Sequence, residues 1–183
     1  MKNLNKLLPI FILGLLISCQ TDWITEYEKI VEKSNEDFSL VKQADTLDNS
    51  NNRITNYSYE SKEVSKLEVN FNKHNLFNNT TEFYKNDSLI FVEKVNARSP
   101  IIYNRQKEKS EPVGEIIERI SYFKNKNYGI EKSRRVKFYL GDDMDNELKK
   151  QIEELKKLDF EIKEIGVKEY LHIQQKYEQY SKY

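Results

Sequence analysis

Cysteine, histidine, proline and glycine are all scarce in this sequence of 183 residues, with one, two, three and five copies respectively. A single cysteine excludes an internal disulfide, so packing alone must hold a folded core together. Scarce glycine and proline leave most turns to asparagine and aspartate. Positive and negative charges are equal in number, so the chain lacks the basic excess of a nucleic-acid-binding domain. We therefore expect no nucleic-acid partner.

Aromatic residues, in contrast, are plentiful. Twelve tyrosines and nine phenylalanines provide large apolar surfaces for a core and argue against a wholly disordered chain. The hydrophobic fraction of 38% lies below the globular average, partly because asparagine and lysine are common throughout. The length suits one domain, with or without an additional arm.

The N-terminus carries the longest uncharged apolar run of the chain. Lys2 and Lys6 precede residues 7–18, and a charged segment followed by a short apolar one is typical of a secretory signal peptide. A helix of twelve residues reaches about 18 Å, well short of the roughly 30 Å of a bilayer core. We expect residues 1–18 to be removed by cleavage between Ser18 and Cys19, which leaves a mature formal charge of −2.

The tetrad Leu16-Ile17-Ser18-Cys19 at the end of this run resembles the lipobox of bacterial lipoproteins. The resemblance implies that the Cys19 sulfur carries a diacylglyceryl thioether and that fatty acids such as palmitate anchor the protein. It places the chain in the bacterial cell envelope, at the outer membrane, with its domain in the periplasm or at the cell surface. Two or three acyl chains give stable anchoring, whereas one chain alone binds marginally. The competing interpretation is an ordinary cleaved signal with an incidental cysteine.

Residues 19–52 are predicted to form the lipidated tether and an N-terminal helix, ahead of a domain at 53–183. Apolar residues recur at helical spacing across 22–42, with glutamate and lysine between them. The asparagine and aspartate of residues 48–52 predict a loop before the domain begins.

From residue 53 the apolar period changes to two, which indicates a sheet over 53–140. Strands expected at 76–85 and 89–95 are joined by an asparagine-rich turn at 86–88. Connections this short favour antiparallel neighbours. The consecutive apolar residues 89–92 predict a strand that is covered on both faces.

A second hairpin, with strands at 116–123 and 128–140, is expected after a long loop at 97–114. Its sequence repeats the first hairpin: residues 83–94 and 122–132 each have an aromatic pair, Lys-Asn, a turn and an apolar strand that ends in Glu-Lys. This pattern resembles the aromatic–turn–strand hairpins of small exported proteins of the Bacteroidetes type, and the resemblance implies no activity. Two copies are too few for a solenoid.

The C-terminal part, residues 141–183, is predicted to be mainly helical. One helix is indicated by an apolar stripe that comprises Met144, Leu148, Ile152 and Leu155. Ion pairs Lys149–Glu153 and Glu153–Lys157 are expected on its solvent side. A short strand at 160–165 ends at Gly166, and the tail from residue 167 is expected to be helical, with a strand as the alternative. The predicted class is α+β: an antiparallel β-meander sheet of about five or six strands, flanked by an N-terminal helix and C-terminal helices.

Candidate catalytic and metal-binding residues are few, and they form no recognisable set. His74 and His172 have no ligand or catalytic partner at suitable spacing. The acidic run 142–147 lacks the glycine of an EF-hand loop and suits the start of a helix. Glu115 and Glu118 are only a weak candidate pair for glycoside hydrolysis. We therefore expect no catalytic residue, no metal and no cofactor.

A short basic stretch, which comprises Lys132, Arg134, Arg135 and Lys137, lies on a predicted strand. Solvent exposure is its simple interpretation, and contact with an anionic headgroup or a glycan is the functional one.

The predicted function is non-enzymatic: a lipid-anchored envelope protein whose domain binds a protein or glycan partner. Two alternatives stay open. One is a periplasmic or surface carrier that encloses a lipid or glycan ligand in an apolar cavity. The other is an inhibitor or immunity-type protein, with residues 97–114 at the centre of an exposed contact surface.

Overall fold

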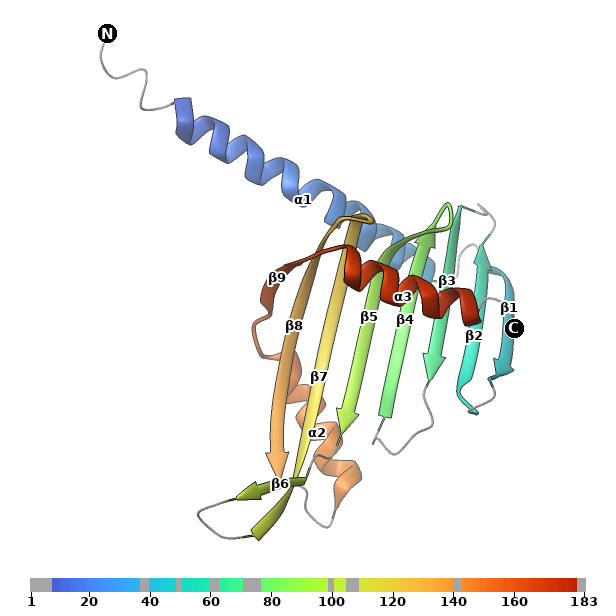
Figure 1. The fold of residues 1–183 in the computed structure, drawn as a ribbon, viewed down its shortest axis with the longest axis vertical. Helices are drawn as coiled ribbons and strands as arrows, with labels where there is room; N and C mark the ends of the chain where they lie inside the picture. Colours follow the sequence, from blue (N-terminus) through green and yellow to red (C-terminus); the bar gives the residue numbers. More distant parts are fainter. Residues whose placement is uncertain are drawn as a thin grey trace. The chain divides into compact units, whose positions relative to one another are not determined.

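The computed structural model divides the chain into two compact units, Met1–Ser39 and Leu40–Tyr183. It describes residues 8–36, 40–48, 51–59, 63–70, 77–98, 101–104, 109–139 and 143–180. His74, one of the two candidate histidines, lies outside the described residues. Figure 1 shows the second unit as a broad sheet with a helix, α3, crossing one of its faces.

The first unit contains helix α1 (Leu8–Asn35). The helix predicted over 22–42 is therefore confirmed over 22–35. It begins earlier than predicted, at Leu8, and it ends earlier, because Leu40 already belongs to a strand. Helical spacing persists to Val41, but antiparallel pairing with the next strand decides the backbone there. Trp23 and Tyr27, one turn apart in α1, make an edge-to-face contact with ring centroids 5.5 Å apart.

Within the described residues, no helix is both long enough and apolar enough to span a membrane.

The second unit is built on an antiparallel sheet. Its described strands are β1 (Leu40–Leu47), β2 (Arg53–Tyr59), β3 (Val64–Asn70), β4 (Phe77–Lys85), β5 (Ser88–Arg98), β6 (Ile101–Asn104), β7 (Lys109–Asn125), β8 (Tyr128–Tyr139) and β9 (Glu161–Ile165). Eight of them follow the order β1-β2-β3-β4-β5-β7-β8-β9, and β6 pairs with β7 alone. The α+β class and the antiparallel sheet are confirmed, and the predicted five or six strands are too few.

The long loop predicted at 97–114 is wrong wherever the structure describes it. β5 continues to Arg98, β6 occupies 101–104, and β7 begins at Lys109. The register joins Ile101 to Pro112 in the β6–β7 ladder. Charged residues and a proline conceal these strands in the sequence, whereas backbone hydrogen bonds to a neighbouring strand do not require an apolar side chain. Pro112 precedes the β7–β8 ladder, which begins at Val113, and so removes no hydrogen bond from that ladder.

The two similar stretches of sequence form two hairpins that lie side by side. Asn86 and Asp87 connect β4 to β5 with φ values of 50° and 60°, as a two-residue type I′ turn requires. β7 and β8 are joined by a two-residue connection at 126–127. The hairpins meet along β5 and β7, where Phe91 lies opposite Tyr122. The repeat seen in the sequence is therefore a repeat in the fold.

Two helices cover opposite faces of this sheet. Leu89, Val92 and Phe123 form a cluster with Tyr170 and Ile173 of α3 (Val167–Tyr180), and this side of the sheet is called the α3 face. Ala97, Ile116 and Phe138 form another cluster with Leu155 of α2 (Met144–Lys156), and this side is called the α2 face. Val92 and Ala97 are an odd number of residues apart on β5, and the register has no shift between them, so their side chains point to opposite faces.

The strand predicted to be covered on both faces is confirmed in β5. Leu89, Ile90, Phe91 and Val92 are all at most 6% exposed. Leu89 and Val92 lie under α3, while Phe91 makes edge-to-face contacts with Phe83 and Tyr122 on the opposite side. A run without alternation is thus explained by burial from both sides.

Helix α2 follows the predicted stripe, since Leu148, Ile152 and Leu155 pack on the α2 face. Its N-cap is Asp143, whose carboxylate accepts a hydrogen bond from the Asn146 N–H at 3.3 Å. The predicted ion pairs are corrected: the structure joins Lys150 to Glu147, Lys156 to Glu153 and Lys157 to Glu154, each three residues apart. Neighbours three and four residues away are both within reach on a helix.

The C-terminal elements agree with the sequence. The short strand is β9, Gly166 separates it from the next element, and residues 167–180 are the helix α3. The Gly166 N–H donates to the Glu169 carboxylate at 3.2 Å, which satisfies one of the unpaired donors at the start of α3. The ring of Tyr170 then packs edge-to-face on Phe123.

Candidate functional site

A groove of about 390 Å³ lies on the α3 face, along β7, β8 and β9. Its walls include Ile117 and Arg119 of β7, Glu131, Ser133 and Arg135 of β8, and Glu161 and Lys163 of β9. The register explains the set: Arg119 lies opposite Ser133, and Ser133 lies opposite Glu161. Paired residues on neighbouring strands point to the same face, so one polar row crosses three strands.

The segment between α2 and β9 forms one wall of the groove through Leu158 and Asp159. Arg134 positions this segment: its guanidinium donates to the carbonyl of Lys156 at 2.9 Å and lies 4.3 Å from the centroid of the Phe160 ring. The same side chain pairs with Glu118. These contacts satisfy carbonyls at the end of α2 and place a cation at its negative end.

Two carboxylates near the groove already have cationic partners. Glu131 pairs with Lys163 at 2.9 Å. Glu115, whose side chain is 4% exposed, accepts two hydrogen bonds from Arg98 at 2.5 and 2.7 Å. Arg135 lies 4.0 Å from Glu115, too far for a hydrogen bond. Arg135 therefore keeps its N–H donors for solvent or a ligand.

Arg119 is exposed in the same groove. On β5 it faces Lys94, and on β8 it faces Ser133. Within the described part of the chain, no carboxylate forms an ion pair with Arg119. The groove thus combines the guanidinium of Arg119, the guanidinium of Arg135 with its long ion pair to Glu115, a hydroxyl, and three acids, of which Glu131 has a cationic partner.

The sequence anticipated part of this site. Arg135 lies on the groove and is exposed, as its simple interpretation expects, but Arg134 is only 14% exposed and is engaged in the fold. Arg119, Ser133 and Lys163 were missed. Alternation along β7 places Arg119 opposite in direction to Ile120, but only the register brings it beside β8 and β9.

The weak glycosidase pair is excluded by the fold. Glu115 and Glu118 are three residues apart on β7, so their side chains point to opposite faces of the sheet. Each carboxylate also has its own arginine, Arg98 for Glu115 and Arg134 for Glu118. Two carboxylates on opposite faces cannot flank one glycosidic bond.

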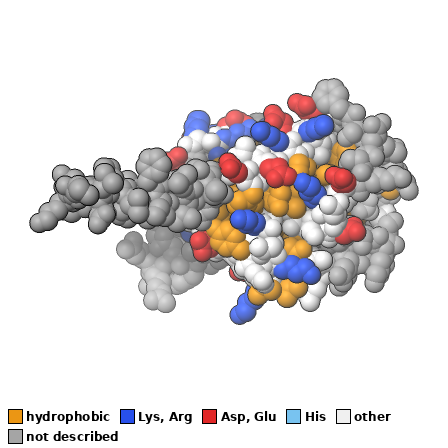
Figure 2. Space-filling view, turned by 90° about the horizontal axis from the view of Figure 1, so that it is seen from above, with side chains coloured by type: hydrophobic (Ala, Val, Ile, Leu, Met, Phe, Trp, Pro, Cys, Tyr) orange, Lys and Arg blue, Asp and Glu red, His pale blue; other side chains and the backbone are white. Residues whose placement is uncertain are grey.

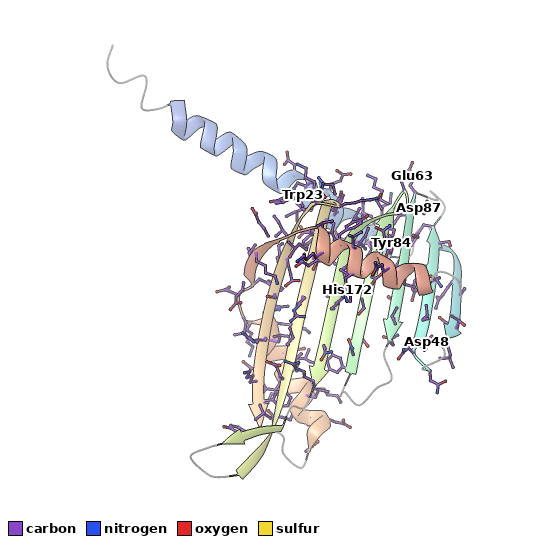
Figure 3. All side chains as sticks on the ribbon, in the orientation of Figure 1. Trp23, Asp48, Glu63, Tyr84, Asp87 and His172 are labelled. Atoms are coloured by element: carbon purple, nitrogen blue, oxygen red, sulfur yellow. The ribbon has the colours of Figure 1, made fainter. Side chains whose placement is uncertain are left out.

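The remaining candidates have structural roles or no described surroundings. His172 is an exposed residue on α3 (Figure 3). Asp143 of the acidic run caps α2. Among the described residues, no group of three histidine, cysteine or acidic side chains is arranged to hold a metal ion. Ser18 and Cys19 belong to α1 by their backbone, and their side chains lie outside the described residues.

The α2 face carries a second set of charged residues. Lys66 pairs with Glu68 at 2.7 Å, and the Tyr57 hydroxyl donates to Glu68 at 2.7 Å. Burial, helped by the hydrogen bond to Glu68, raises the pKa of Tyr57. Burial also raises the pKa of Glu93, with a further contribution from the nearby Glu118 carboxylate. The contacts of Glu68 with Lys66 and Tyr57 are local and mutually satisfied, whereas burial and the Glu118 carboxylate both disfavour the charged form of Glu93.

Replacing Glu93 with glutamine is expected to stabilise the protein at pH 7 and to make little difference at pH 4. A carboxyl whose pKa is raised by folding stabilises the folded state below its ordinary value of 4.5. That contribution is lost as the pH rises through the folded pKa. Thermal unfolding of both proteins at the two pH values measures the effect. Glu154→Gln is the control: its hydrogen bond to Lys157 lowers the pKa of Glu154, so its pH dependence has the opposite sign. Equal pH dependence in both variants would contradict the assignment.

Charge is mixed rather than concentrated on the side of the molecule drawn in Figure 2, where basic and acidic side chains are interspersed around hydrophobic ones. The chain matches no family model, no curated protein and no solved structure. Its function is therefore inferred from its own residues.

Proposed function

We propose that this chain is a lipid-anchored protein of the bacterial cell envelope that binds a partner without catalysing a reaction. The observation that carries the proposal is the tetrad Leu16–Cys19, which ends a charged-then-apolar N-terminal segment at the only cysteine of the chain. Lipidation of Cys19 gives that cysteine a chemical role as a thioether and accounts for an exported protein with one unpaired thiol. The acyl chains bind the membrane, and the location is the outer membrane, with the sheet in the periplasm or at the surface.

The groove on the α3 face supports a binding role for the sheet domain. Its volume of about 390 Å³ falls in the range of small-molecule sites. Its walls carry arginine, lysine, serine and acidic side chains, which suit a polar ligand. Among the carrier functions, this lining favours a glycan or another hydroxylated ligand over a lipid tail, because burying a lipid tail against charged groups is unfavourable.

Intact-mass analysis of the membrane-extracted protein tests the anchor. The wild-type chain is expected to begin at Cys19 and to carry the mass of the acyl groups, and the Cys19→Ala variant is expected to lack that mass and to leave the membrane fraction. Ser34→Ala, another replacement of a small polar residue but outside the tetrad, should retain the acyl mass. A wild-type protein that is cleaved elsewhere, or that carries no acyl group, would refute the proposed anchor.

A further inference from the structure

We infer that the groove on the α3 face binds an oxyanion, a phosphate or carboxylate on a hydroxylated ligand, through the guanidinium groups of Arg119 and Arg135. The inference rests on the proposed function in one respect, namely that the sheet domain is a binding module. It adds the chemical class of the ligand and the residues that recognise it.

The first argument is the surroundings of Arg119. This exposed arginine lines the groove on β7, with Ser133 opposite it on β8. No acid among the described residues forms an ion pair with Arg119. Its guanidinium can therefore donate charge-assisted hydrogen bonds to an anion bound in the groove.

The second argument is the position of Arg135 relative to Arg119. Arg119 lies opposite Ser133, so Arg135 is its diagonal neighbour on β8. The Cα atoms of such diagonal neighbours are about 7 Å apart. Arginine side chains are long enough for both planar guanidinium groups to reach one oxyanion from this distance. Guanidinium groups donate paired hydrogen bonds that match the geometry of phosphate and carboxylate. Ser133 lies beside Arg119 and offers a further hydroxyl donor.

The third argument is the charge of the other groove residues. Glu131 is paired with Lys163. Glu115, which is not part of the groove wall, is held by Arg98 at hydrogen-bond distance and lies 4.0 Å from Arg135. Asp159 and Glu161 are exposed at the β9 side of the groove. Carboxylates there accept hydrogen bonds from hydroxyl groups and repel a second negative charge. The groove therefore suits a ligand with one oxyanion and several hydroxyls, either free in solution or as the headgroup of a membrane lipid.

The test is a titration of the full chain with glycerol 1-phosphate in a neutral detergent. The protein is isotope-labelled, and its amide chemical shifts are followed by NMR. Saturable shifts are expected for residues of β7, β8 and β9 around Arg119 and Arg135, and uncharged glycerol should produce none at the same concentration. Arg119→Gln is expected to weaken binding by about tenfold or more, the effect of losing a charge-assisted hydrogen bond. Arg119→Lys keeps the charge but loses the planar guanidinium, so its affinity should lie between those of the wild type and Arg119→Gln.

Arg53→Gln is the matched control, because it removes one positive charge from the opposite face, where Arg53 pairs with Asp45 at 2.6 Å. It should bind as the wild type does. Vesicles of phosphatidylglycerol, compared with phosphatidylcholine, distinguish the sources: binding that depends on Arg119 assigns the oxyanion to a headgroup, and binding to glycerol 1-phosphate alone assigns it to a soluble ligand. Absence of saturable binding, equal shifts with glycerol, or equal weakening in Arg53→Gln would overturn the inference.

The mass of the same sample separates this result from the proposed anchor. A lipidated, folded protein that does not bind glycerol 1-phosphate overturns only the oxyanion site. A protein that binds the phosphate but carries no acyl group overturns only the anchor.

Discussion

Replacing Tyr170 with alanine is expected to lower the free energy of unfolding by about 3–5 kcal/mol, the range for removing a large buried aromatic side chain. Tyr170 is 1% exposed, and its ring packs edge-to-face on Phe123 with centroids 5.4 Å apart. It also belongs to the cluster that joins Tyr84, Leu89 and Ile165. Its loss leaves a cavity between α3 and the sheet, because neighbouring side chains relax only partly. Urea denaturation followed by circular dichroism measures the change.

The adjacent residue provides a matched control for this prediction. Leu171 is 46% exposed on the same helix, so Leu171→Ala is expected to change the free energy of unfolding by less than about 1 kcal/mol. Helix propensity differs little between leucine and alanine. Similar losses in both variants would mean that α3 does not pack on the sheet through Tyr170.

Replacing Gly129 with alanine is expected to destabilise the protein by about 1–3 kcal/mol, the usual result of forcing extra volume into a packed core. An added Cβ would clash with the backbone carbonyl oxygen of Tyr122 and lie 3.0 Å from both Ile165 Cγ1 and Phe123 Cδ1. The backbone oxygen is held by the β7–β8 ladder, so it cannot move without breaking strand pairing. The midpoint of urea denaturation, at an unchanged slope, reports the loss.

Gly166→Ala is the corresponding control, because the nearest atom to an added Cβ at that position is the Asn127 carbonyl oxygen at 3.8 Å. This is an ordinary van der Waals distance, so the expected change is below about 1 kcal/mol and reflects the start of α3 rather than packing. If Gly129→Ala lowers the free energy of unfolding no more than Gly166→Ala does, then the backbone at Gly129 is not packed as closely against β7 and β9 as the structure indicates.

The two ends of the α3 face differ in what they contribute. α3 covers only one end of its face (Figure 1), and the groove lies on the part of β7, β8 and β9 beyond it. Tyr84 under α3 and Asp87 at the turn mark the covered end in Figure 3. The aromatic residues of the repeated hairpins stabilise that end of the sheet, and the polar residues farther along the same strands are left to contact a ligand.

Several parts of the fold could be predicted because their causes are local. The period of two from residue 53, the turn at Asn86 and Asp87, and the stripe of α2 each depend on residues close in sequence. The repeat of residues 83–94 in residues 122–132 also identified the two hairpins at the centre of the sheet. Strands at 40–47 and 101–104 were not predicted, because their pairing is set by a neighbouring strand rather than by their own composition.

The candidate functional residues likewise include some that the local sequence reveals and others that only strand pairing brings together. The tetrad that ends at Cys19, and with it the expectation of a lipid anchor, depends only on the order of the first nineteen residues. The groove depends on the register of β7, β8 and β9, which brings Arg119, Ser133 and Glu161 into one row. The tertiary structure alone decided that Arg134 is engaged in the fold while Arg135 is available. Side-chain direction alternates along a strand and can be predicted, but the residues that lie beside it across the sheet are fixed by pairing between distant segments.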